Sequence, residues 1–75
     1  MSIGEAAQEE LNRDGKPVVI TADTDGNVFA VIGTVARALK NHDCAAAARD
    51  FKNRALHASD YDHVLRISME YVEFE

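Results

Sequence analysis

The pattern of apolar and polar residues predicts a helix and then a short strand at the start of the chain. Ser2 to Glu5 has the S-x-x-E form of a capping box, and good helix formers follow it, so we expect a helix over residues 3–13. Asp14 to Pro17 ends this helix, because glycine supplies a left-handed terminal residue and proline cannot continue the hydrogen-bond ladder. The β-branched residues that follow suit a pleated strand, which we place at residues 17–22.

The turn at Asp23 to Asn27 allows two interpretations of the apolar run after it. An Asp-Gly pair between two apolar runs favours a hairpin, which would make residues 28–32 a second strand. The apolar positions, however, recur at helical spacing and Asn27 is a favoured N-cap, so we predict a helix over residues 28–40. Gly33 in its middle costs about 1 kcal/mol relative to alanine, which a closely packed neighbouring backbone would explain.

Two more helices are predicted in the second half. Asp43 can cap a helix over residues 44–56, and Ser59 to Asp62 opens the last one in the same way. The sequence from Tyr71 to Glu75 alternates, so a closing strand is the alternative to a helical end. Several polar residues of the 44–56 helix are expected to face water: Arg49, Asp50, Lys52, Asn53 and Arg54.

Together these elements predict a mostly α domain with a minor β element, an α+β fold in the order α-β-α-α-α. No repeat or linker divides the chain, so we interpret residues 1–75 as one small domain, with the helix at 3–13 as a peripheral addition.

The size of the chain makes self-association an expectation. A domain of 75 residues buries only about 60% of its unfolded surface, and the single cysteine cannot form an internal disulfide. The last helix also has a second apolar face that needs a partner. We therefore predict a homo-oligomer, with these contact residues: Val31, Ile67, Tyr71 and Phe74.

The charge of the chain is negative overall but unevenly distributed. The net charge is −5, while residues 26–58 carry two acidic against five basic residues. No basic face free of nearby carboxylates can be drawn from the sequence, so nucleic acid is disfavoured as a partner. With one cysteine, no apolar leader and no run near the about 20 residues of a membrane helix, we expect a cytoplasmic protein that does not bind membranes.

The residues that could ligate metals lack the required spacing. Asp23 to Asn27 resembles the start of a calcium loop, but its glycine is fourth instead of sixth, and Thr34 stands where the bidentate glutamate belongs. The zinc-type ligands are too irregularly spaced for a structural site: His42, Cys44, His57 and His63. We predict no metal and no cofactor.

Catalysis is disfavoured for a related reason. Cys44 could pair with His57 or His63, oriented by Asp60 or Asp62, and the dipole of a following helix would favour its thiolate. Cys44 also belongs to an apolar stripe, however, which is typical of a buried structural thiol. We predict that the chain is not an enzyme.

An anion site is the remaining chemical possibility. Gly26 precedes a predicted helix N-terminus, and Arg37 and Lys40 lie one turn apart further along that helix. These three residues are the candidate ligand-binding set.

The chain also resembles a known group of proteins in certain turn and packing motifs: Thr24-Asp25-Gly26-Asn27, Phe29-Ala30, Ile32-Gly33, Arg37-Ala38-Leu39, Asp60-Tyr61-Asp62 and Met69-Glu70-Tyr71-Val72. The group consists of short acidic proteins encoded by bacteriophages, prophages and other bacterial mobile elements. The resemblance spans about residues 20–75, and it implies an intracellular accessory factor that modifies or blocks a host process.

The leading functional hypothesis is therefore a non-enzymatic protein-binding module that inhibits a bacterial host protein, such as a defence protein. The alternatives are an oligomer that sequesters an anionic nucleotide and a structural oligomerisation module.

Overall fold

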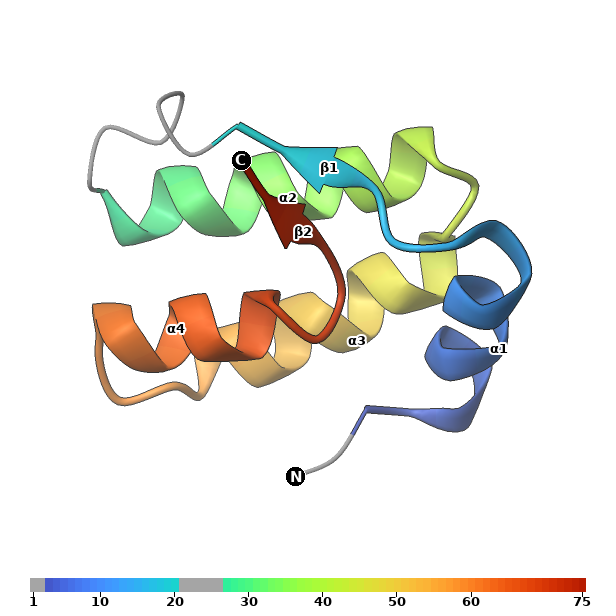
Figure 1. Cartoon of the computed structure of the whole chain (residues 1–75). Coiled ribbons are helices and arrows are strands. Elements are labelled where there is room, and N and C mark those ends of the chain that lie inside the picture. The colour runs from blue at the N-terminus through green and yellow to red at the C-terminus, as the bar shows by residue number, and fades with distance from the viewer. Residues whose placement is uncertain (1–2, 21–26) are drawn as a thin grey trace.

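The computed structural model describes residues 3–20 and 27–75 and has the predicted fold class. Along the chain the elements are α1 (Glu5–Asp14), β1 (Val18–Val19), α2 (Val28–Asn41), α3 (Ala45–Leu56), α4 (Tyr61–Ser68) and β2 (Glu73–Phe74). The predicted mostly helical α+β architecture is confirmed, and so is the closing strand that the sequence left as an alternative (Figure 1).

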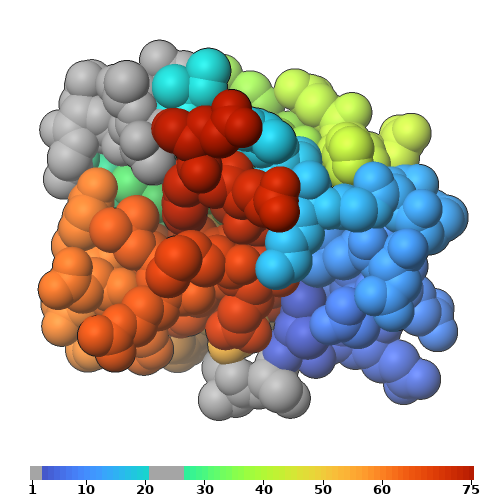
Figure 2. Space-filling view, in the orientation of Figure 1, coloured from blue at the N-terminus to red at the C-terminus, as the bar shows by residue number. Residues whose placement is uncertain are grey.

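The two short strands bring the N-terminal and C-terminal parts of the chain together. They pair in parallel, with Val18 opposite Glu73 and Val19 opposite Phe74. The Glu73 amide donates to the Pro17 carbonyl, and the Glu75 amide to that of Val19, both at 2.9 Å. In the space-filling view, the red C-terminal segment lies beside the cyan residues of β1 on the face that is shown (Figure 2). The strand is shorter than the predicted 17–22, of which residues 21 and 22 lie outside the described part.

Helix α1 is part of the core and is not peripheral as expected. Its buried residues Ala7 and Leu11 pack in the cluster that holds the other helices. The helix begins at Glu5, two residues after the predicted start. Its N-cap is Gly4, which has no side chain and so makes no side-chain capping bond. Ser2 lies outside the described residues. Gly15 ends the helix with φ 77° and ψ 175°, a conformation that is essentially restricted to glycine.

Helix α2 settles the ambiguity after the turn in favour of the helix. The side chain of Asn27 accepts a hydrogen bond from the Phe29 amide at 2.9 Å, as predicted for an N-cap. At the other end the amides of Asp43 and Cys44 bond to the carbonyls of Lys40 and Leu39, which is the Schellman arrangement. Asp43 takes the left-handed position of this motif, with φ 60°.

Asp43 therefore ends α2, and it does not cap α3 as the sequence suggested. The N-cap of α3 is Cys44, which makes no side-chain capping bond. Glu10 of α1 supplies the missing cap: its carboxylate accepts hydrogen bonds from the amides of Ala46 and Ala47 at 3.2 and 2.7 Å.

Helix α4 begins in the segment predicted to open it, and it ends before the residues that form the closing strand. The Asp60 side chain accepts from the His63 amide at 2.8 Å, and the helix stops at Ser68. Tyr71 therefore lies beyond the helix, where its ring packs edge-on against Phe51 with the centroids 5.5 Å apart.

This packing overturns the predicted contact surface. Val31 and Tyr71 are fully buried and Ile67 is 5% exposed, while Phe74 is half-buried against the core. The second apolar face of the last helix is thus covered within one chain, and the argument from it for self-association no longer holds. A homo-oligomer stays a prediction.

A buried polar network completes the core and corrects the expectation that Arg54 faces water. Arg54 is 8% exposed and forms two 2.9 Å hydrogen bonds to the Glu70 carboxylate and one to the Tyr71 hydroxyl. The Tyr71 hydroxyl in turn donates to Asp50, which also accepts from the Gly4 amide. The network joins α3 to both ends of the described chain.

Candidate functional site

The residues predicted to bind an anion are partly brought together. Arg37 and Lys40 are exposed on α2, and they line a surface depression of about 310 Å³. Gly26, the third predicted residue, lies outside the described residues. The complete lining is Gly33, Ala36, Arg37, Lys40, Asn41 and Lys52.

The local sequence explains why these side chains face outward together. Val31, Val35 and Leu39 turn inward at helical spacing, so the opposite side of α2 carries the exposed residues. Lys52 belongs to α3 and is exposed next to buried Phe51. Sequence reasoning missed Lys52, although its helical spacing from Ala48 and Ala55, both buried, places it at the edge of the stripe that packs on α2.

Among the described residues, no carboxylate lines the depression. Helix α2 contains no acidic residue, and the one acidic residue of α3, Asp50, is bonded to Tyr71 and Gly4. Within residues 3–20 and 27–75, Arg37, Lys40 and Lys52 form no ion pair. The described lining of this depression is therefore basic, in contrast with the chain's net charge of −5, and Asp43 follows Lys40 by three positions.

Gly33 lies at this site with open space beside it. A Cβ atom added there would meet no heavy atom within 4 Å beyond the helix's own nearby backbone, so the close backbone contact expected from the sequence is absent. The packing of the described residues therefore gives no reason for glycine at this helical position.

Exposed apolar side chains flank the cations on the same two helices. Phe29, one turn before Gly33, is 71% exposed, and Leu56, one turn after Lys52, is 64% exposed. They have the highest exposures among the large apolar residues in the described part of the chain. We call the exposed residues Phe29, Gly33, Arg37, Lys40, Lys52 and Leu56 the α2–α3 face.

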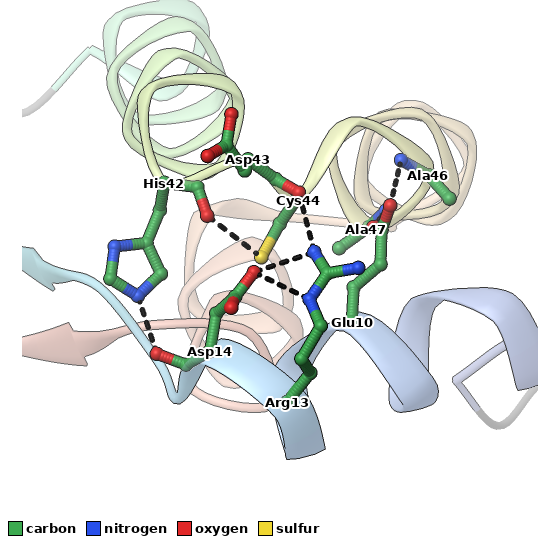
Figure 3. A network of polar contacts seen from close by, with 8 residues as sticks. All are labelled: Glu10, Arg13, Asp14, His42, Asp43, Cys44, Ala46 and Ala47. Atoms are coloured by element: carbon green, nitrogen blue, oxygen red, sulfur yellow. Dashed lines mark hydrogen bonds and ion pairs between the residues drawn. The ribbon is translucent and has the colours of Figure 1, made fainter.

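Cys44 does not have the environment of a nucleophile. The thiol is fully buried and bonds to the His42 carbonyl at 3.4 Å, as Figure 3 shows. Burial, together with the nearby Glu10 and Asp14 carboxylates, raises the pKa of the Cys44 thiol. The positive end of α3 that was expected to favour a thiolate is occupied by Glu10.

The histidines have structural partners, and they do not gather into a metal site. His42 shares a 2.7 Å hydrogen bond with the Asp14 carbonyl, which fastens α1 to the end of α2 (Figure 3). His57 bonds to the Asn53 carbonyl, and His63 accepts from the Ser59 amide. Among the described residues, no group of three or more potential ligands could hold a metal ion.

Comparison with known proteins gives no relative. The chain matches no family model, no curated protein and no solved structure. No helix within the described ranges has the length and apolar character needed to cross a membrane.

Proposed function

We propose that the chain is a small protein-binding module that uses the α2–α3 face to bind an acidic surface of another protein. The single observation that supports this is the depression lined by three cations without a carboxylate, on a chain that is otherwise acidic. An uncompensated positive patch attracts a negative partner and accelerates its association.

The apolar neighbours favour a protein as the partner. Protein interfaces are rich in aromatic residues and arginine, and their binding energy centres on a few such anchors. The α2–α3 face offers an exposed phenylalanine eight residues before Arg37 on the same helix. A nucleic acid would be held mainly by phosphate contacts, which need more cations than the three that line the depression.

The test compares two double variants that change the net charge equally. Lys40→Gln/Lys52→Gln removes two cations from the face, and Lys16→Gln/Arg66→Gln removes two exposed cations elsewhere. Each protein is immobilised and exposed to a bacterial lysate, and captured proteins are quantified by mass spectrometry and then rebound in purified form.

We expect the control variant to retain a specific acidic protein that the first variant loses, with a dissociation constant raised about tenfold. Equal retention by the two variants, or capture of no protein that rebinds when purified, would contradict the proposal. That the partner is a host protein, blocked on binding, is a further part of the proposal, which only the identity of the captured protein tests.

A second candidate, sequestration of an anionic nucleotide, is favoured by the convergence of Arg37, Lys40 and Lys52 on one depression. A ligand that binds only the folded chain stabilises it. ATP, cyclic dinucleotides and inorganic phosphate are therefore added separately in thermal unfolding. A rise in melting temperature that Lys40→Gln/Lys52→Gln abolishes supports this function, and no shift with any of them removes it.

A further inference from the structure

We propose that the partner presents an acidic amphipathic helix, which packs across α2 at Gly33. This inference rests on the proposed function and specifies what the α2–α3 face receives.

On α2, the α2–α3 face has the shape of a ridge with a notch at Gly33. Phe29, Gly33, Arg37 and Lys40 follow one another at spacings of four, four and three residues, so they form one ridge along about 17 Å of α2. Glycine leaves a notch in this ridge, because no side chain and no neighbouring atom fills the space. Helices pack by fitting ridges into grooves, and their separation depends on the size of the side chains at the contact point. A notch in the ridge is where a second helix can approach most closely.

The glycine that forms the notch lowers the stability of the helix. Glycine inside a helix is less favourable than alanine, and no described residue packs closely enough against this position to require it. Replacing Gly33 with alanine should therefore stabilise the free chain. A residue that lowers stability in this way is informative about binding, because its benefit then lies outside the free chain.

The α2–α3 face suits a helical ligand and not an extended peptide. An extended peptide is held by hydrogen bonds to free backbone groups at a sheet edge. The depression is lined by residues of α2 and α3, and neither helix presents a free sheet edge. A helix satisfies its own backbone, and it needs only carboxylates for the cations and apolar residues for Phe29.

A second copy of the chain fits this face poorly. Two copies that met through it would bring six cations into one interface, and like charges in contact oppose association. An acidic helix neutralises the same cations.

The experiment uses two fluorescent peptides of identical composition and the full chain. The first is an 18-residue stapled helix with a leucine stripe flanked by glutamates, and the second has the same residues in scrambled order around a proline. Dissociation constants are measured by fluorescence anisotropy for the wild type, Gly33→Ala, Gly33→Leu and Lys40→Gln/Lys52→Gln. Melting temperatures of the free proteins verify that each variant folds.

We expect the wild type to bind the helical peptide about tenfold more tightly than the scrambled one. Gly33→Leu fills the notch and weakens helical binding about tenfold, with little effect on the scrambled peptide. Gly33→Ala raises the melting temperature of the free chain by about 4–8 °C, because alanine is the better helix former.

Equal binding of the two peptides, no binding of the helical peptide, or undiminished binding by Gly33→Leu would overturn the inference. If Gly33→Leu binds like the wild type while Lys40→Gln/Lys52→Gln loses binding, the proposed function stands and only the helical mode fails. If Lys40→Gln/Lys52→Gln also binds like the wild type, both fail. Dimerisation of the free wild type that Gly33→Leu abolishes, measured by light scattering, would make the occupant a second copy and would also overturn the inference.

Discussion

At the scale of single residues, two of the described positions have left-handed backbone conformations but different residue types. Gly15 suits its position, since its dihedral angles lie in a region that other residues rarely enter. Asp43 has φ 60° in the Schellman turn after α2, where a side chain adds strain that glycine would avoid. The two residues therefore predict opposite effects of substitution.

Replacing Asp43 with glycine should stabilise the chain by about 0.5–1 kcal/mol, because the native φ costs glycine little. The bond from Arg13 to the Asp43 carbonyl uses the backbone and is retained. Urea unfolding of Asp43→Gly measures the gain, and Gly15→Ala is the opposite control, with a loss of about 1 kcal/mol or more. A stability loss in Asp43→Gly would show that the aspartate side chain itself stabilises this turn.

Cys44 should be unreactive in the folded chain. Only the thiolate is nucleophilic, and the thiol is both fully buried and raised in pKa. Iodoacetamide at neutral pH should therefore modify the native chain far more slowly than the chain in guanidinium chloride, as mass spectrometry can follow. Comparable rates would mean that the thiol is accessible and would revive a catalytic role.

At the scale of elements, α3 depends on α1 for its N-terminal cap. Glu10 supplies the oxygen acceptors that Cys44, at the N-cap, does not supply. The interaction places a negative charge at the positive end of α3 while joining two helices that are distant in sequence.

Glu10→Ala should therefore lower the free energy of unfolding by about 1–2 kcal/mol. The matched control is Glu9→Ala, which removes the same charge from an exposed neighbouring position and should change stability by less than about 0.5 kcal/mol. Chemical denaturation followed by circular dichroism compares them. Equal effects would show that net charge matters here and the cap does not.

Local signals in the sequence were enough to predict the helices, but the partners of distant residues were not readable. Asn27 and Asp60 cap the helices that directly follow them; Asn27 was predicted as a cap, and Asp60 belongs to the segment that was predicted to open the last helix. The Glu10 cap joins residues 36 and 37 positions apart, and no local pattern encodes such a pair. The same applies to the strands, each only two residues long and paired between opposite parts of the sequence.

The candidate site was predictable in part for the same reason. Arg37 and Lys40 share one face of one helix, which helical spacing reveals. Lys52 joins them only because α3 packs beside α2, and the absence of described carboxylates from the lining is likewise a tertiary property. The buried Arg54 was misplaced because a charged residue in a helix usually faces water, and its partner Glu70 lies sixteen positions away.

At the scale of the whole molecule, the Arg54–Tyr71–Asp50 network connects α3 with both ends of the described chain. Burial and the neighbouring Asp50 raise the pKa of Tyr71 to about 12, although Arg54 opposes the shift. The phenol is thus protonated in the folded chain at pH values where the unfolded chain, with a pKa near 10.0, loses its proton.

The titration of Tyr71 should therefore leave stability unchanged below about pH 10 and should lower it as the pH rises from there toward 12. Unfolding free energies between pH 8 and 11.5 test this against Tyr71→Phe, which we expect to be about 1–2 kcal/mol less stable at pH 8 and less sensitive to alkali. The raised pKa of Cys44 acts in the same direction in both proteins, so their difference isolates Tyr71. Parallel pH curves for the two proteins would contradict the assignment.

The measurement that tests the central claim most directly is a map of the binding surface by nuclear magnetic resonance. Backbone amide shifts of the isotopically labelled chain are recorded while the acidic helical peptide is added. We expect the changes in chemical shift to concentrate at residues 29–40 and 49–56, the exposed sides of α2 and α3. Shifts centred on α1, α4 or the β1–β2 sheet, with none along α2, would contradict it.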